Sequence, residues 1–157
     1  MRLLLLSFVA ACVVAAPTAS AAPAKKSDDM KCVLHAKLAA ESAAGSTSTA
    51  TGHTLIKVPE DGTIEFKTKI NNEDGETFIA AHIHQGAVGI EGPPVELLLD
   101  GPPTSASKIK QSGVATPLAD VTGANLCADP SAYYVNYHST AFPAGRDPRA
   151  AALVAEA

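Results

Sequence analysis

The amino-acid sequence predicts an all-β protein, folded as an antiparallel β-sandwich. Apolar and polar residues alternate with a period of two in several segments, and turns containing Gly and Pro recur between these segments. No segment shows the periodicity of an amphipathic helix. Period-two alternation is typical of strands with one buried and one solvent-facing side. Short strands separated by such turns are typical of sandwiches.

The first residues are predicted to be an export signal. Arg2 precedes an apolar stretch over residues 3–16, and the Ala-Ser-Ala run at residues 19–21 provides the small residues of a signal-peptidase site. We therefore expect a cleaved signal peptide over residues 1–21. An alternative reading of the same region places a lipid anchor on Cys12.

The rest of the chain is long enough for one domain with a core of its own. We expect a flexible linker over residues 22–30, rich in Ala, Lys, Ser and Asp, and a single β-sandwich domain over residues 31–157. No later segment has the ~20 consecutive apolar residues of a membrane-spanning helix. The protein is therefore expected to be secreted or periplasmic.

The charge balance is mildly acidic. The chain has 12 Lys and Arg against 16 Asp and Glu, and loss of Arg2 with the signal leaves 11 − 16 = −5. Because the sequence shows no cluster of Lys or Arg, we expect the protein to bind neither nucleic acid nor an anionic membrane. The sequence does not identify the binding partner, for which a protein, a small molecule and a metal ion are the alternatives.

Two cysteines remain after cleavage, Cys32 and Cys127. In an oxidising compartment such a pair usually forms a disulfide. Closing so long a loop stabilises a fold by about 4–5 kcal/mol in the chain-entropy account. Metal ligation and free thiols are the alternatives, although the spacing is not that of a zinc motif.

The first three strands are predicted over residues 31–38, 54–58 and 64–70. In the first, Cys32 and the apolar residues that alternate after it face inward. The Pro-Glu-Asp-Gly run at residues 59–62 closes the second strand, because Pro presets φ and Gly accepts a positive φ. In the third, apolar residues alternate with Glu and Lys, so that one side is core and the other is solvent.

A turn over residues 71–76 leads to a fourth strand over residues 77–84. Its inner face is expected to carry Ile79, Ala81 and Ile83. The acidic residues of the turn lack the regular spacing of Ca²⁺ ligands, so we expect them to be solvated.

The later elements are less regular. A Gly- and Pro-containing loop precedes a short strand over residues 95–99, and residues 101–130 are expected to form a long loop without clear patterning. A strong strand follows over residues 133–138, in which Tyr133, Val135 and Tyr137 are expected to pack inward rather than to form a ligand-binding aromatic face. A weak last strand is expected over residues 149–154.

Three histidines are the candidate functional residues. His82 and His84 are two residues apart, so they project from the same face of the fourth strand. His138 shares its face of the strand at 133–138 with Asn136. If these two strands are neighbours, the three imidazoles meet, and three histidines can hold one Zn or Cu ion with a coordination position left open. Asn136 is then expected to fix the tautomer of an imidazole from outside the ligand set.

The histidine cluster has three interpretations. It is a structural hydrogen-bonded node, a Cu or Zn site with a structural or storage role, or a redox or hydrolytic metal site. The sequence contains no catalytic triad, nucleophile elbow or phosphate-binding loop, so no catalytic residue is assigned. His35 and His53 are expected to be solvated surface histidines.

Together these motifs resemble the CHRD family, which is named after chordin. The resemblance rests on the AHIHQG run at residues 81–86, the GPPV run at 92–95 and the YVNYHST run at 134–140, and it spans roughly residues 31–154. It implies a secreted immunoglobulin-like or Cu/Zn-superoxide-dismutase-like sandwich that acts as a binding or interaction module, without an established enzymatic activity.

The same resemblance leaves a small Cu or Zn metalloprotein with superoxide-dismutase-like redox activity as the alternative. The further histidines that a second, bridged metal would need are missing from the sequence. The chain also departs from the family pattern near its end, where GRDPRA occupies residues 145–150. Because Pro148 cannot donate to a β-ladder, the last strand is expected to begin after it or to lie at a sheet edge.

Overall fold

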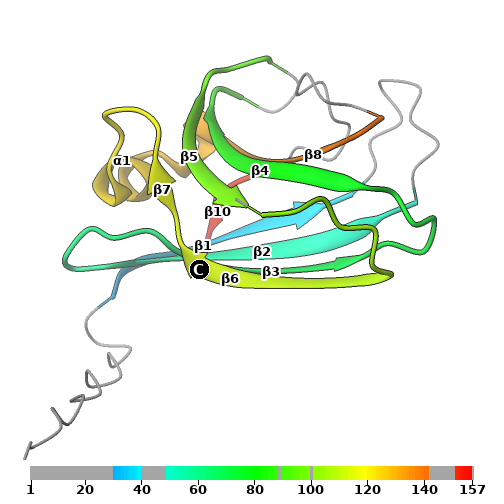
Figure 1. Ribbon diagram of the computed structural model, residues 1–157. Coiled ribbons are helices and arrows are strands. Elements are labelled where there is room, and N and C mark those ends of the chain that lie inside the picture. Colours follow the sequence, from blue (N-terminus) through cyan, green and yellow to red (C-terminus); the bar gives the residue numbers. More distant parts are fainter. Residues whose placement is uncertain (1–29, 40–48, 88–89, 100, 142–150, 157) are drawn as a thin grey trace, which may run out of the picture.

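Two antiparallel sheets of five strands each pack face to face as a β-sandwich (Figure 1), which confirms the predicted fold class. The computed structural model describes residues 30–39, 49–87, 90–99, 101–141 and 151–156. The predicted signal peptide, the alternative anchor at Cys12 and residues 22–29 of the predicted linker lie outside the described residues. In the described part of the chain, no helix has the length and apolarity that crossing a membrane requires.

The first sheet contains the N-terminal strand of the domain and has the order β10-β1-β2-β3-β6. Its strands are β1 (Met30–Leu38), β2 (Thr51–Pro59), β3 (Glu65–Asn71), β6 (Lys108–Val114) and β10 (Val154–Ala155). The predicted strands over 31–38, 54–58 and 64–70 correspond to β1, β2 and β3. Their alternation decides which side faces the second sheet.

The second sheet has the order β7-β5-β4-β8-β9. Its strands are β4 (Phe78–Gln85), β5 (Pro94–Leu99), β7 (Thr116–Pro117), β8 (Tyr133–Ser139) and β9 (Ala151–Ala152). Two short helices, α1 (Gly123–Ala128) and η3 (Pro130–Ala132), precede β8. The predicted strands over 77–84, 95–99 and 133–138 correspond to β4, β5 and β8.

The core lies between the sheets. Fully buried apolar side chains come from both sheets, from α1 and from the link between β9 and β10: Leu34, Ile56, Val58, Phe78, Ile83, Val95, Leu126, Val135, Tyr137 and Leu153. One polar contact lies among them, because the hydroxyl oxygens of Thr54 and Thr68 are 2.8 Å apart on neighbouring strands. Tyr133, Val135 and Tyr137 pack inward as expected.

The structure corrects the expectation of a long loop over residues 101–130, because this region contains β6, β7, α1 and η3. β6 lacks the alternation of apolar and polar residues that predicts a strand. Its inward positions are Ile109, Gln111 and Gly113, and only Ile109 has an apolar side chain. Gly113 leaves room for Phe66, whose ring lies 3.4 Å from where a Cβ atom would stand. α1 has only six residues, too few for a helical period to be read.

A bulge corrects the expected inner face of β4. The register with β8 shifts between Phe78 and Ala80, so Phe78 rather than Ile79 enters the core. The ring of Phe78 meets that of Tyr137 edge-on, with the centroids 6.2 Å apart. After the bulge, Ala81 and Ile83 face inward as expected.

The last predicted strand is divided between the two sheets. β9 lies at the edge of the second sheet and β10 at the edge of the first, with the buried Leu153 between them. Both segments begin after Pro148 and lie at sheet edges, as the proline predicts. The first two residues of the predicted strand, 149 and 150, lie outside the described residues.

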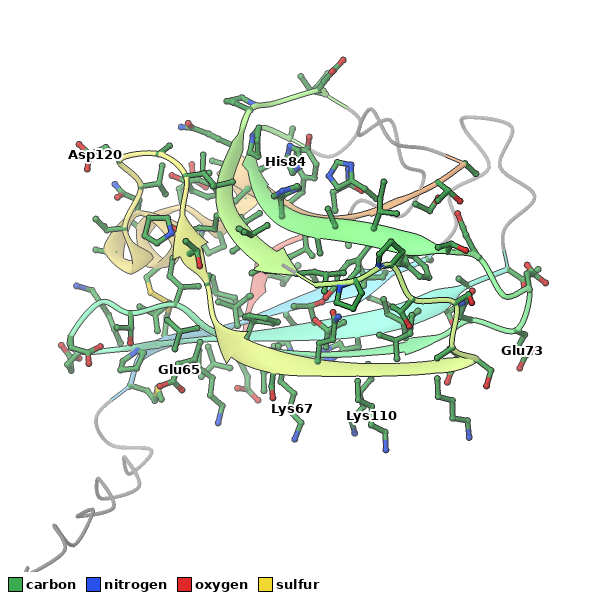
Figure 2. The ribbon with its side chains drawn as sticks, viewed as in Figure 1. Glu65, Lys67, Glu73, His84, Lys110 and Asp120 are labelled. Atoms are coloured by element: carbon green, nitrogen blue, oxygen red, sulfur yellow. A yellow bond between two sulfur atoms is a disulfide. The ribbon has the colours of Figure 1, made fainter. Side chains whose placement is uncertain are left out.

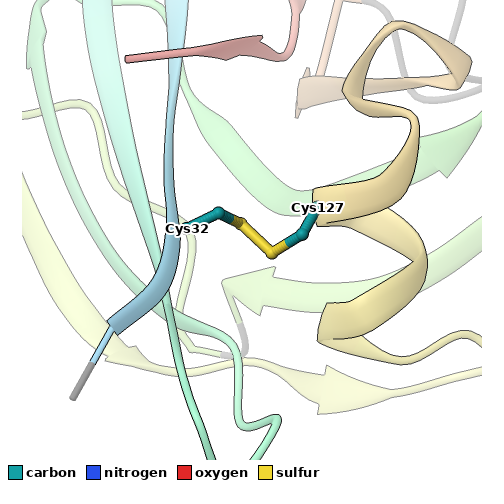
Figure 3. Close-up of a disulfide and its surroundings, with 2 residues drawn as sticks. All are labelled: Cys32 and Cys127. Atoms are coloured by element: carbon teal, nitrogen blue, oxygen red, sulfur yellow. A yellow bond between two sulfur atoms is a disulfide. The ribbon is translucent and has the colours of Figure 1, made fainter. Parts of the chain in front are cut away.

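A disulfide joins Cys32 of β1 to Cys127 of α1 (Figure 3), with their Cα atoms 5.8 Å apart. This confirms the predicted pairing. The bond fastens the first sheet to the short helices that lead into β8. Disulfides persist in oxidising compartments, which agrees with an exported protein.

Candidate metal centre

The three predicted histidines project from the outer face of the second sheet, on the side away from the core. β4 and β8 are hydrogen-bonded neighbours, and their register places Ala80 opposite His138, His82 opposite Asn136 and His84 opposite Tyr134. Because the inward positions of both strands carry apolar residues, the alternating histidines must face outward. Figure 2 shows His84 on this outer side of β4.

The structure brings the three imidazoles together. One nitrogen from each of His82, His84 and His138 can be chosen so that all three lie within 4.8 Å of one another. The shortest separation is 2.9 Å, between His82 Nδ1 and His138 Nε2, a distance at which one ring N–H donates to the other nitrogen. The ring centroid of His84 lies 5.6 Å from that of His82 and 5.6 Å from that of His138.

His84 is held by two neighbours that the sequence analysis did not single out. Its Nδ1 lies 2.8 Å from the carbonyl oxygen of Gly92, and its ring stacks on Tyr134 with the centroids 5.0 Å apart. The backbone N–H of Gly92 donates to the hydroxyl of Tyr134 at 3.2 Å. The alternation of its strand places Tyr134 on the face of Asn136 and His138, although its contact with His84 was not predicted, and nothing in the sequence shows where the Gly92 carbonyl points.

The bond to Gly92 decides the tautomer of His84. A carbonyl oxygen only accepts hydrogen bonds, so Nδ1 must carry the proton and Nε2 must present its lone pair. That Nε2 atom is buried and has no hydrogen-bond partner among the described residues, and the residue as a whole is 6% exposed. A buried acceptor without a partner is costly, so its position needs a reason.

The electrostatics of the site favour neutral rings. Burial, and then the nearby His84, lower the pKa of His82. Burial also lowers the pKa of His84, although its bond to Gly92 and the carboxylate of Glu91 act in the opposite direction. Neutral imidazole is the form that binds metal ions.

The arrangement can hold one metal ion. A tetrahedral Zn²⁺ ion with Zn–N distances of ~2.0–2.1 Å keeps its ligand nitrogens about 3.4 Å apart. The separations of 2.9 Å and up to 4.8 Å bracket that value, so small rotations of the rings suffice. For one ion to be bound by both His82 Nδ1 and His138 Nε2, the ring that donates in this hydrogen bond would have to carry its proton on its other nitrogen.

Asn136 is fully buried and lies opposite His82 in the register. This places it beside the cluster, and its expected role in fixing a tautomer stays a prediction. His35 and His53 lie on the other sheet, where His35 Nδ1 and His53 Nε2 are 3.0 Å apart. They are therefore paired with each other and take no part in the cluster.

Comparison with protein-family models gives one result: the model of the CHRD domain matches residues 34–146, which is more than half of the 157-residue chain. The match includes all three histidines, Asn136 and Cys127. No curated protein and no solved structure matches the chain significantly.

Proposed function

The chain belongs to the CHRD family, and we propose that it is an exported binding module whose ligand is a single Zn²⁺ or Cu²⁺ ion held by His82, His84 and His138. The family supports the broader part of this proposal, a binding or interaction module. The choice of a metal ion as ligand rests on the chemistry of the histidine cluster.

The observation that carries the proposal is the buried lone pair of His84 Nε2. A purely structural histidine would be expected to use both ring nitrogens, because each unsatisfied buried polar atom costs about 1–3 kcal/mol. Here Nδ1 of His84 is hydrogen-bonded to the carbonyl oxygen of Gly92, and Nε2 has no hydrogen-bond partner among the described residues. Two more imidazole nitrogens lie within 4.8 Å.

Three protein ligands leave one position of a tetrahedral ion open. Water or a donor atom from a partner molecule would fill that position, so the ion would mediate binding of a second ligand. A redox role would require copper, since zinc has no redox chemistry. Because Cu²⁺ binds most nitrogen sites more tightly than Zn²⁺ whatever their role, the redox activity of the copper-loaded protein, and not the relative affinity, separates a redox protein from a binding module.

The test is calorimetry on protein purified without a His-tag and stripped with a chelator. We expect one equivalent of Zn²⁺ or Cu²⁺ per chain, with an affinity that falls below about pH 6 because protons compete for imidazole. His84→Gln should weaken binding at least about tenfold, because it removes one of three ligands. The matched control is His53→Gln, which removes one imidazole from the other sheet.

Two outcomes would reject the proposal. The first is no binding of either metal by the wild-type protein whose circular dichroism shows a folded domain. The second is binding that His53→Gln abolishes and His84→Gln leaves intact. In either case the cluster is a hydrogen-bonded node that joins β4, β8 and the Gly92 segment.

A further inference from the structure

The outer face of the first sheet gathers lysines that are dispersed along the sequence. Six exposed lysines stand at paired outward positions of β1, β2, β3 and β6: Lys37, Lys57, Lys67, Lys69, Lys108 and Lys110. Figure 2 shows Lys67 and Lys110 projecting from this side, opposite to the side of His84. No basic cluster is evident in the sequence, because lysines that are neighbours in the sheet are far apart in the chain.

Four of these outward positions form one straight row across the sheet. Lys37 pairs with His53, His53 with Lys69, and Lys69 with Lys110. Since adjacent strands lie ~4.7–4.9 Å apart, the row spans about 14 Å. Lys67 stands two residues from Lys69 on the same face.

Little negative charge offsets this row. Glu65 is the one carboxylate at the outward positions of β1, β2, β3 and β6, and Glu156 approaches His35 from the β10 edge at 3.7 Å. None of the lysines on this face forms an ion pair within the part of the chain that the structure describes. Burial, followed by the positive charges of His35 and Lys69, lowers the pKa of His53.

Such a row opposes folding. Lys69 lies directly opposite Lys110, and like charges in that position destabilise a sheet. The chain as a whole is acidic, with a net charge of −4. The protein therefore concentrates its positive charge on one face although its composition does not require this.

We propose that this face, defined as the lysine row Lys37, His53, Lys69 and Lys110 with Lys67 beside it, binds a linear acidic polysaccharide. Sulfate or carboxylate groups along an extended chain are complementary to the ammonium groups of Lys37, Lys69 and Lys110 in this line, between which His53 can donate a hydrogen bond. The sheets of a sandwich lie ~10 Å apart, and the Debye length is ~8 Å at physiological salt. The carboxylates on the far side of the molecule therefore offset the attraction only in part.

The composition of the face argues against the two other common polyanions. Single-stranded nucleic acid is bound by aromatic side chains on which bases stack, but every Tyr of the chain and the described Phe66 and Phe78 are buried. An anionic membrane is a plane, whereas a β-sheet is twisted, so a flexible polymer follows the row better. Among the described residues, two valines are the large exposed apolar side chains on or beside this face, Val114 and Val154. Two valines provide little apolar surface for insertion into lipid.

The experiment uses dextran sulfate as probe and neutral dextran of equal length as control, at ~0.15 M salt. We expect the wild-type protein to bind dextran sulfate and not neutral dextran. The triple variant Lys37→Gln, Lys69→Gln, Lys110→Gln should bind at least about tenfold more weakly, with a shallower salt dependence. The same three lysines changed to Arg should bind within about threefold of wild type, because the charge is kept.

Single variants distinguish the effect of a lysine's position in the row from the effect of the protein's net charge. Lys69→Gln and Lys57→Gln remove the same charge from the same face, but Lys57 lies outside the row, opposite Glu65. We expect Lys69→Gln to weaken binding more. Equal affinities of wild type and the triple Gln variant would overturn the proposal and leave the lysines a role in solubility. Tighter binding to phosphatidylglycerol vesicles or to a single-stranded oligonucleotide than to dextran sulfate would also overturn it.

Discussion

Glu96 is a buried carboxyl group on β5. Its register partner is Ile83, whose side chain is in the core, so Glu96 shares the inner face of the sheet. The residue is 1% exposed, and its Oε2 atom has no hydrogen-bond partner among the described residues. Burial raises the pKa of Glu96 to about 7. At neutral pH the carboxyl group is therefore partly ionised in the folded protein, and its buried charge destabilises the fold.

This gives a stability prediction with a definite sign. The folded state binds a proton that the unfolded state releases between the unfolded pKa of 4.5 and the folded value of about 7. The free energy of unfolding should therefore decrease as the pH rises through this window, by at most about 3 kcal/mol. Glu96→Gln cannot ionise, so it should be more stable than wild type at pH 8 and nearly equal to it at pH 4.

Urea denaturation at both pH values measures the effect. Glu73→Gln is the control, because it removes one carboxylate from an exposed turn. A difference between Glu96→Gln and wild type that does not grow with pH would contradict the assignment of a buried, titrating Glu96.

Gly92 is the second residue whose environment predicts a measurable effect. A Cβ atom built there would lie 1.7 Å from the backbone oxygen of Gln85. Since no side-chain rotation relieves a clash with backbone, Gly92→Ala should displace the carbonyl that holds His84. We expect a loss of about 1–3 kcal/mol in unfolding free energy, and weaker metal binding, as for other overpacked sites.

Gly101→Ala is the matched substitution. Its Cβ atom would meet Leu99 Cδ1 at 3.8 Å, an ordinary contact, so stability should stay within about 0.5 kcal/mol of wild type. Thermal melting of the two variants, with Zn²⁺ titration of each, makes the comparison. Equal melting temperatures would show that the Gly92 backbone is not held where the structure places it.

At the scale of elements, the disulfide joins β1 to α1 across 95 residues of sequence. Cross-linking so long a loop removes conformational freedom from the unfolded chain. The double variant Cys32→Ala, Cys127→Ala should lose about 2–5 kcal/mol of stability, which lowers the melting temperature by on the order of 10 °C. Calorimetry under non-reducing conditions tests this, and an unchanged melting temperature would contradict it.

The elements that the sequence predicted are those whose own side chains fill the core. β1 and β3 alternate strictly, because every second residue packs against the opposite sheet. β6 could not be predicted, since its inward Gln111 and Gly113 depend on Phe66 of β3 to fill the space. The bulge at Phe78 could not be predicted from the sequence either, because a register shift depends on the partner strand.

The histidine site was predictable in part for the same reason. Two-residue spacing placed His82 and His84 on one face, and a neighbouring β8 was the one further assumption. Gly92 was missed because its contact with His84 depends on the path of a loop, whereas the place of Tyr134 opposite His84 follows from the pairing of β4 with β8. The lysine row was missed altogether, because strand order and register across four strands create it.

For the whole molecule, the histidine cluster and the lysine row lie on opposite outer faces of the sandwich (Figure 2). We therefore expect the two to act independently. His84→Gln should leave the affinity for dextran sulfate within about twofold of wild type, and the triple Lys→Gln variant should leave Zn²⁺ affinity equally unchanged, because distant sites rarely couple. Reciprocal titrations measure both, and a loss of more than about tenfold in either cross-experiment would show that the faces communicate.

The pairing of β1 with β10 has a consequence for the time course of folding. Leu34, at the start of the domain, pairs with Ala155, and the backbone N–H of Glu156 donates to the carbonyl oxygen of Val33 at 3.0 Å. Contacts between such distant residues form late and slowly, on the scale of milliseconds to seconds in all-β domains. The first sheet therefore lacks its β10 edge until residues from the two ends of the domain have met.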